Sequence, residues 1–264
     1  MKISKNQTDA DAFQVPALAR ALTILELLAT HPDGMRMREI AEKLELPANS
    51  VFRITGLLEE RGYLHREGED MRYTLSRKLL SLGYAAIGED KLIEHALDVM
   101  QLLRDETQET VLVGVRADTQ GVVLEQVAAT QPVKFLVDPG THFPLHSAAP
   151  GKVFVAFLPP VERAALLKRI KFTRYNERTL DTRAKFEAEI ENVLAAGYGL
   201  DCAEQIEGIH CVGAPIFNHR GYPIAAIWVT GPSFRFPEAD LPRMGIKVVA
   251  AAQRISQRFG YKIL

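Results

Sequence analysis

The apolar positions near the start of the chain recur with the period of α-helices. Leucines at three- and four-residue steps after Pro16 predict a helix that ends within residues 31–34: Leu18, Leu22, Leu25, Leu27 and Leu28. A shorter helix stops before Pro47, because proline restricts the residue that precedes it. The apolar face of this shorter helix carries Ile40, Ala41 and Leu44. A third helix is predicted for about residues 48–60, with these residues facing inward: Val51, Ile54, Leu57 and Leu58.

Two short runs that favour β-strands follow the third helix. They cover residues 63–66 and 71–75, and a polar segment that contains Gly68 separates them, which predicts a β-hairpin. Three helices, the last two joined by a very short turn, and then a hairpin is the order of a winged helix-turn-helix. We therefore expect such a domain at residues 15–75, after a disordered tail at residues 1–14 that carries few large apolar groups.

Helical periodicity continues over residues 76–90, which we interpret as a linker helix between two domains. The apolar residues of this region exceed what a connecting helix can bury against a small winged domain: Leu79, Leu80, Leu82, Ile87, Leu92, Ile93 and Leu97. A helix that is apolar over so broad an arc needs a second partner. The pattern therefore predicts a two-fold dimer of this chain.

Residues 91–264 mix the two kinds of element. Strands are expected at 110–116, 121–127, 133–137, 211–217 and 223–230, and helices at 150–158, 160–170, 182–196 and 237–259. Strands clustered between helices, without regular βαβ alternation, indicate an α+β sheet domain. A domain of this length can bury both a core and a pocket.

The composition narrows the class of protein. The 264 residues are 47% hydrophobic and 25% charged, and 32 Lys+Arg nearly balance 33 Asp+Glu, so bulk charge does not bind this protein to polyanions. Two cysteines, Cys202 and Cys211, do not make a disulfide-rich secreted scaffold. No apolar stretch reaches the roughly 18–20 residues of a membrane span, and the N-terminus lacks the apolar core of a signal peptide. We expect a soluble, cytoplasmic protein without a membrane partner.

A winged helix-turn-helix places its second helix in the major groove, where the first residues of that helix face base edges. The candidates here are Ala48, Asn49, Ser50, Phe52 and Arg53, of which Asn and Arg suit adenine and guanine edges. Further arginines are placed to meet phosphates, two before this helix and two at the hairpin: Arg36, Arg38, Arg66 and Arg72. The net charge does not decide whether this domain binds DNA, because residues 50–78 hold six Lys/Arg and five Asp/Glu. A small protein-interaction module stays open as the alternative.

Three separated runs carry a resemblance to a known family. They are VPALARALTILELLATHPDGMRMREIAEKLELPANSVFRITGLLEERGYLHREGEDMRYTLSRKLLSLG, PLHSAAPGKVFVAFL and GYGLDCAEQIEGIHCVGAPIFNHRGYPIAAIWVTGP. In this order they resemble the IclR family of bacterial transcription regulators, over about residues 15–260. The resemblance implies a GAF-like effector domain behind the DNA-binding domain. It also implies binding to a palindromic operator in double-stranded DNA as a homodimer or dimer of dimers. Repression is favoured, although activators occur in the family.

The resemblance further implies a pocket for a small, usually acidic metabolite. Carried over to this sequence, the pocket residues are Phe135, Ala149, Pro150, Asp201, Ile209, Cys211, Trp228 and Thr230. The helix that opens at residues 149–152 favours a carboxylate through its free N–H groups and its dipole. Two residues depart from the family pattern, because Pro150 has no backbone N–H and Trp228 stands where a serine is common.

Strand alternation adds an expectation about the only tryptophan. Trp228 and Thr230 share one face of their strand, and Ile227 and Val229 share the other. A ring beside Thr230 removes volume from the pocket. We therefore expect a small organic acid with one or two carboxylates or hydroxyls as the effector.

Patterns for catalysis and metal binding are incomplete. The arginine after Ser233-Phe234 breaks a G-x-S-x-G elbow, and His210 and Cys211 are strand neighbours that face opposite ways. Lys152 follows a glycine but lacks the other residues of a phosphate-binding loop. No metal-ligand spacing connects Cys202, Glu204, His210, Cys211 and His219. We expect no enzyme, metal or cofactor. The alternatives are an enzyme with an incidental N-terminal module, and an oligomerisation or sensor protein without DNA affinity.

Overall fold

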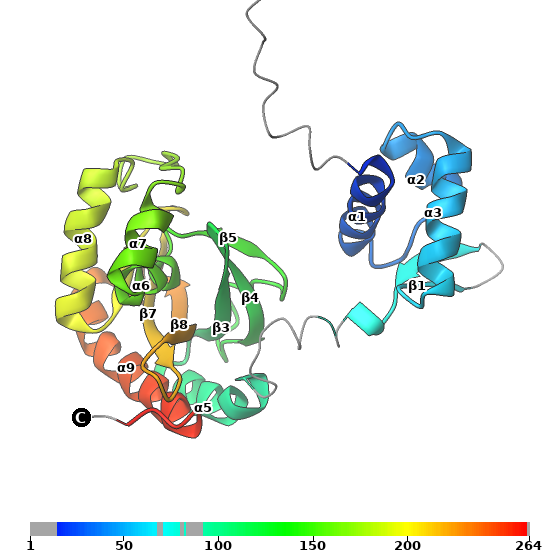
Figure 1. Cartoon of the computed structure of the whole chain (residues 1–264). Coiled ribbons are helices and arrows are strands. Elements are labelled where there is room, and N and C mark those ends of the chain that lie inside the picture. Colours follow the sequence, from blue (N-terminus) through cyan, green and yellow to red (C-terminus); the bar gives the residue numbers. More distant parts are fainter. Residues whose placement is uncertain (1–14, 68–70, 80–81, 83–91, 263–264) are drawn as a thin grey trace, which may run out of the picture. The chain divides into compact units, whose positions relative to one another are not determined.

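The computed structural model describes residues 15–67, 71–79, 82 and 92–262. The chain divides into two compact units, Met1–Asp90 and Lys91–Leu264 (Figure 1). The predicted tail at residues 1–14 and most of the predicted linker helix at residues 76–90 lie outside the described residues.

The described residues between 15 and 75 form three helices and a hairpin, in the predicted order. The helices are α1 (Pro16–Ala29), α2 (Met37–Lys43) and α3 (Ala48–Glu60), and β1 (Leu64–Glu67) pairs with β2 (Arg72–Leu75) in antiparallel register. Side chains from every one of these elements meet in one core: Ile24, Leu28, Met35, Ile40, Ala41, Val51, Leu64 and Tyr73. The short connection between α2 and α3 and the hairpin behind them give a helix-turn-helix with a wing.

Several of the leucines that predict α1 and α3 are exposed. Leu18 and Leu22 are 56% and 51% exposed, and Leu57 of α3, which was expected to face inward, is 53% exposed. Ile24 and Leu28 fill the core instead. Because α1 is apolar on more than one face, the spacing of its leucines predicts a helix but does not decide which stripe is buried.

The second unit is built on one antiparallel sheet with strand order β5-β4-β3-β8-β7-β6. The strands are β3 (Thr110–Ala117), β4 (Gln120–Val127), β5 (His142–Pro144), β6 (Gly199–Cys202), β7 (Ile209–Phe217) and β8 (Pro223–Pro232). The two longest strands, β7 and β8, lie side by side near the middle, and their alternate side chains enter cores on both faces of the sheet.

Helices cover both faces of this sheet (Figure 1). On one face lie α5 (Leu92–Thr107) and α9 (Leu241–Arg258), which follows the short 3-10 helix η2 (Glu238–Asp240). On the other face lie α6 (Ala149–Phe157), α7 (Pro160–Leu167) and α8 (Arg183–Ala196). Ile227 and Val229 face the first layer and Trp228 faces the second, as strand alternation predicts.

Two parts of the sheet differ from the expectation. Residues 133–137 are not a strand, because their backbone groups bond to side chains: Val137 N–H donates to Gln126 Oε1 at 3.1 Å, and Arg235 Nη2 donates to the Val133 carbonyl at 2.8 Å. The outer neighbour of β4 in the sheet is β5 rather than residues 133–137. β6 is an additional strand, which its four residues are too few to predict from alternation.

Candidate functional site

The second unit encloses a cavity of about 150 Å³ on the sheet face that carries Trp228. Its walls come from β4, β5, β6, β7, β8, the start of α6, the turn after β6, and residues 131–139, which we call the cover segment. Seven of the eight residues expected for the pocket line this cavity: Phe135, Pro150, Asp201, Ile209, Cys211, Trp228 and Thr230. Ala149 does not line it; Ala149 is fully buried in the first turn of α6, and its neighbour Ala148 lines the cavity instead.

The Trp228 ring forms part of the apolar wall of the cavity. It packs edge-on against Phe143, with ring centroids 5.3 Å apart, and its six-membered ring lies close to Gly114 of β3. A Cβ on Gly114 would lie 3.0 Å from Cη2 of the indole and would also collide with the Val122 carbonyl. The glycine is therefore what allows this ring to fit.

Three polar side chains cross the sheet in a row on the same wall. Cys211 of β7 is the register partner of Asp201 in β6 and of Thr230 in β8. The Cys211 thiol donates to the Thr230 hydroxyl, with Sγ and Oγ1 3.1 Å apart. Burial raises the pKa of Cys211 well above its usual value, so the thiol stays a neutral donor. The row offers hydrogen-bonding groups to a small polar ligand.

Asp201 is the acidic member of the row, and only 5% of it is exposed. Its Oδ1 accepts a hydrogen bond of 2.8 Å from the Glu204 N–H and so caps the turn that follows β6. Burial raises the pKa of Asp201 from its ordinary 3.8 to about 7, and the nearby Glu204 carboxylate adds to this effect. At neutral pH the carboxyl group is therefore poised between its two protonation states.

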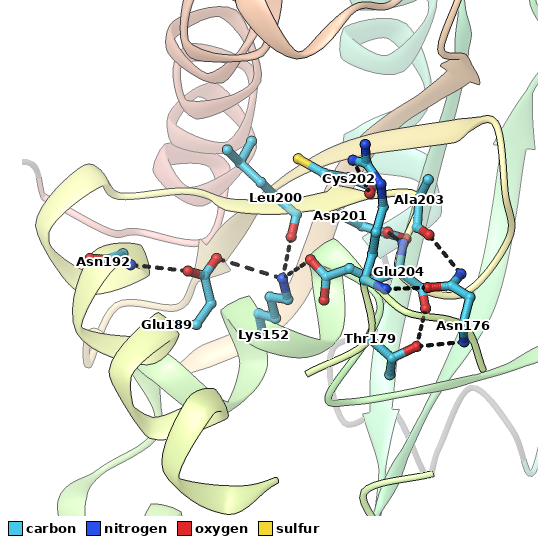
Figure 2. A network of polar contacts seen from close by, with 11 residues as sticks. Lys152, Asn176, Thr179, Glu189, Asn192, Leu200, Asp201, Cys202, Ala203 and Glu204 are labelled. Atoms are coloured by element: carbon cyan, nitrogen blue, oxygen red, sulfur yellow. Dashed lines mark hydrogen bonds and ion pairs between the residues drawn. The ribbon is translucent and has the colours of Figure 1, made fainter. Parts of the chain in front are cut away.

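A buried lysine lies beside the turn that follows Asp201 (Figure 2). Lys152 of α6 is 1% exposed, and its Nζ donates to the Leu200 carbonyl at 2.7 Å and to Glu204 Oε1 at 2.5 Å. Glu189 Oε1 of α8 lies 3.6 Å from the same nitrogen. Glu204 Oε2 is buried and has no hydrogen-bond partner among the described residues. Burial raises the pKa of Glu204 although Lys152 opposes this.

Further hydrogen bonds fix the turn that carries Glu204 (Figure 2). Thr179 Oγ1 donates to the Glu204 carbonyl at 2.7 Å, and Asn176 Nδ2 donates to the Ala203 carbonyl at 2.8 Å. Ala203 has a positive φ of 62°, which the turn imposes on a non-glycine residue. This network was not expected from the sequence. The signal was present, because Lys152 is the one charged residue of an otherwise apolar helix and such a charge requires a buried partner.

The cover segment is held by a second buried ion pair. Arg235 forms two parallel hydrogen bonds with Glu109, Nε to Oε1 at 2.7 Å and Nη2 to Oε2 at 3.0 Å. The same guanidinium donates to the Val133 carbonyl at 2.8 Å. The Glu109 side chain is 5% exposed. Arg235 and Gln126, which accepts from Val137 N–H, thus hold the segment over the cavity.

In the first unit, the expected base-reading residues lie at the start of α3. Ala48, Asn49, Phe52 and Arg53 are exposed, and Arg53 makes no hydrogen bond or ion pair with another described residue. Ser50 is half-buried and accepts a hydrogen bond of 3.2 Å from Arg20 Nη1. The exposed residues leave this end of α3 accessible to a ligand.

The other arginines expected at phosphates have partners within the unit. Arg72 donates to the Gly34 carbonyl at 2.8 Å and lies 3.4 Å from Glu39, and Arg66 lies 3.5 Å from Glu59. Arg38 forms an exposed ion pair with Glu42 at 2.9 Å. Arg36 is the N-cap of α2, and its N–H donates to Glu39 Oε2 at 2.8 Å. Arg72 in particular ties the wing to the turn before α2.

The remaining candidates do not assemble into other sites. His210 faces away from Cys211, and its Nδ1 donates to the Phe236 carbonyl at 2.7 Å. Within the described residues, no three His, Cys, Asp or Glu side chains gather in the manner of metal ligands. No helix in the described part of the chain has both the length and the apolar character needed to cross a membrane.

A winged helix-turn-helix and an α/β sheet domain with a cavity together form the architecture of a transcription regulator with an effector-binding domain. Comparison of the sequence with known protein families supports this assignment. Residues 17–68 match the IclR helix-turn-helix domain, and residues 84–257 match the domain described as bacterial transcriptional regulator IclR C-terminal. The chain belongs to the IclR family, whose members are transcription regulators rather than enzymes. The expected GAF-like effector domain is confirmed with it.

Individual relatives cover nearly the whole chain. The transcriptional regulator BhcR of Paracoccus denitrificans is 29% identical, over 93% of this chain and 88% of BhcR. The transcriptional repressor IclR of Escherichia coli is 25% identical, over 94% of this chain and 91% of the repressor. The crystal structure of the Thermotoga maritima IclR superimposes with a TM-score of 0.74 at 29% identity, and the match covers 94% of this chain and 100% of that one.

Proposed function

We propose that this regulator represses transcription from a palindromic operator and that a small organic acid in the cavity of about 150 Å³ controls its affinity for that operator. The observation that carries the proposal is the row of Asp201, Cys211 and Thr230 on one wall of an otherwise apolar cavity. A cavity of about this volume holds a molecule of roughly six heavy atoms, since an engineered cavity of similar size in another protein binds benzene. Repression is favoured by the similarity to the transcriptional repressor IclR of Escherichia coli. Binding to chromosomal DNA requires that it act in the cytoplasm.

The DNA contacts are assigned to the exposed start of α3. Asn49 and Arg53 lie one helical turn apart, so they reach the same stretch of a groove. Arg53→Ala should weaken binding to DNA selected by the protein from a random pool by about 1–3 kcal/mol. Arg183→Ala on α8, an exposed arginine of the second unit, is the control and should leave binding unchanged. Equal affinities of Arg53→Ala and wild type would remove Arg53 from the interface.

Self-association is supported by the exposure of leucines on α1. Leu18 and Leu22, one helical turn apart, are 56% and 51% exposed. The interface is assigned to this helix, and the groove between α1 and α3, which also holds Asn49 and Arg53, is left to DNA. A second copy of the chain would cover this apolar surface and would supply the second recognition helix that a palindrome requires. We propose a homodimer or a dimer of dimers. Sedimentation at micromolar concentration should give a dimer or tetramer, and Leu18→Asp should shift it toward monomer. A monomeric wild type with and without DNA contradicts the assembly.

The effector site is tested by the emission of Trp228, the only tryptophan of the chain. Titration with carboxylates of about six heavy atoms should change this emission saturably, because the ring lies on the cavity wall. Thr230→Val removes a hydroxyl from the polar row at nearly constant volume and should raise the midpoint. Thr173→Val, outside the cavity, is the matched control. Binding by calorimetry without any effect of Thr230→Val would place the site elsewhere.

A further inference from the structure

The surroundings of Asp201 do not, on balance, favour its ionised form. Lys152 is the cation that acts on this cluster, and its Nζ lies 2.5 Å from Glu204 and 3.6 Å from Glu189. Asp201 receives one backbone N–H from Glu204 at a single oxygen, and the neutral Cys211 thiol next to it is a weak donor that lowers the pKa of Asp201 less than burial raises it. An ionised Asp201 would therefore be a buried anion whose nearest cation is already paired with another carboxylate, which is costly in a medium of low dielectric constant.

We propose that Asp201 binds the carboxylate of the effector as a neutral carboxylic acid, so that the site takes up one proton together with its ligand. This inference rests on the proposed organic-acid effector and adds the chemistry by which the site recognises it. Oδ1 of Asp201 keeps its bond from Glu204 N–H, and Oδ2 carries the proton and donates it to a carboxylate oxygen. The proton comes from solvent and no covalent bond of the ligand changes.

The neighbouring row supplies the rest of the recognition. The Thr230 hydroxyl accepts from the Cys211 thiol, and because a hydroxyl both accepts and donates, Thr230 keeps its own O–H for the ligand. Asp201 and Thr230 lie on either side of Cys211 across neighbouring strands, which are spaced about 4.8 Å apart. A carboxylate over Cys211 thus lies between two O–H donors. This arrangement compensates for the N–H that Pro150 cannot offer at the start of α6.

The other ionisable groups around Asp201 come from six parts of the fold: Lys152 of α6, Glu189 of α8, Cys202 of β6, Glu204 of the following turn, Cys211 of β7 and His142 of β5 across the cavity. Burial raises the pKa of Cys202 to about 11 and that of Cys211 well above its usual value, so both stay protonated at neutral pH. Lys152 and Glu204 are held by their ion pair. Burial raises the pKa of Asp201 to about 7, and an anion bound beside it raises it further.

The coupling of proton uptake to ligand binding predicts how the affinity for a carboxylate changes with pH. Below about pH 7 the free protein already holds the proton on Asp201, so the affinity for a carboxylate should not depend on pH. Above about pH 7 the proton must be taken up with the ligand. The affinity should then fall by close to tenfold per pH unit, until the pKa of the complex is reached.

The test uses the full chain and a panel of small carboxylates, with acetate, lactate and malonate as probes and lactamide as the uncharged counterpart of lactate. Affinities are measured by Trp228 emission and by calorimetry between about pH 6 and pH 9. Calorimetry at about pH 8 in HEPES and in Tris, which differ in ionisation enthalpy, counts the protons taken up and should give about 0.9. Asp201→Asn keeps an acceptor for Glu204 N–H and presents an N–H to the ligand, so it should bind with a flat pH profile. His142→Gln removes the histidine of the cavity wall and should keep the wild-type profile.

Each outcome decides the inference. A flat profile in wild type, or a slope that persists in Asp201→Asn or disappears in His142→Gln, overturns the assignment of the proton to Asp201 while the effector site stands. If no carboxylate of the panel binds, the organic-acid proposal fails and this inference fails with it. If Asp201→Asn does not fold, the proton count of wild type and the profile of His142→Gln still decide between uptake and no uptake.

Discussion

Removal of the buried lysine should destabilise the second unit strongly. Lys152→Met retains most of the side-chain volume but leaves the Glu204 carboxylate buried without its cation, and it also removes the donor to the Leu200 carbonyl. Breaking a buried ion pair by deleting one partner costs about 3–5 kcal/mol, and the 1% exposure of Lys152 allows little solvent to compensate. Urea unfolding followed by Trp228 emission measures this cost for the second unit alone, because the chain has no other tryptophan.

A second substitution separates the charge from the packing. Glu204→Gln in the Lys152→Met background removes the uncompensated anion, so the double variant should regain about half or more of the lost free energy of unfolding. Asp118→Asn, which breaks an exposed ion pair with Arg169, is the control and should change stability by less than about 1 kcal/mol. A cost of Lys152→Met below about 1 kcal/mol, or a double variant no more stable than the single one, would refute the reasoning.

Three further predictions concern the cavity. Asp201→Asn should stabilise the ligand-free protein at about pH 8 by up to about 4 kcal/mol. The pKa of Asp201 is raised from 3.8 in the unfolded chain to about 7 in the folded state, so ionisation of Asp201 lowers the free energy of unfolding progressively between these pH values. Denaturation at about pH 4 should therefore show no gain in stability for Asp201→Asn over wild type. Arg235→Ala should speed amide exchange in the cover segment and the release of bound ligand, because the guanidinium holds the Val133 carbonyl. Gly114→Ala should lower stability by about 2 kcal/mol or more and shift Trp228 emission, since the added methyl meets the indole and the backbone of β4.

A specific result would contradict each of these three predictions. A gain for Asp201→Asn that is equal at about pH 4 and pH 8 would mean that Asp201 does not titrate differently on folding. Unchanged exchange in the cover segment of Arg235→Ala would assign its position to other contacts. Wild-type stability of Gly114→Ala would show that the indole has room to move.

The order of the elements could be predicted from the sequence because local spacing determines it. Strand alternation was enough to put Trp228 and Thr230 on one face, and the resemblance to the IclR family pointed to positions that the structure gathers around one cavity. Ala149 falls outside that cavity because α6 turns its side chain into the core, a rotation that motif position does not reveal.

Contacts between distant segments could not be read in the same way. Lys152, Glu189 and Glu204 are far apart in sequence, and only the packing of α6 against α8 and the turn after β6 joins them. The side chains of Gln126 and Arg235 bond to the backbone of residues 131–139, which therefore do not form the strand that their composition favours. On α1, the choice between the stripe of Leu18 and that of Ile24 depends on neighbours that periodicity does not describe.

The central claim is that occupation of the cavity changes the affinity for DNA. Fluorescence anisotropy of a DNA duplex selected by the protein, titrated with protein in the absence and presence of the carboxylate that saturates Trp228 emission, tests it most directly. The account predicts a change in DNA affinity of about 5- to 150-fold, with the same carboxylate midpoint as the emission change and a raised midpoint in Thr230→Val. A carboxylate that fills the cavity and leaves the affinity for DNA unchanged would contradict the account.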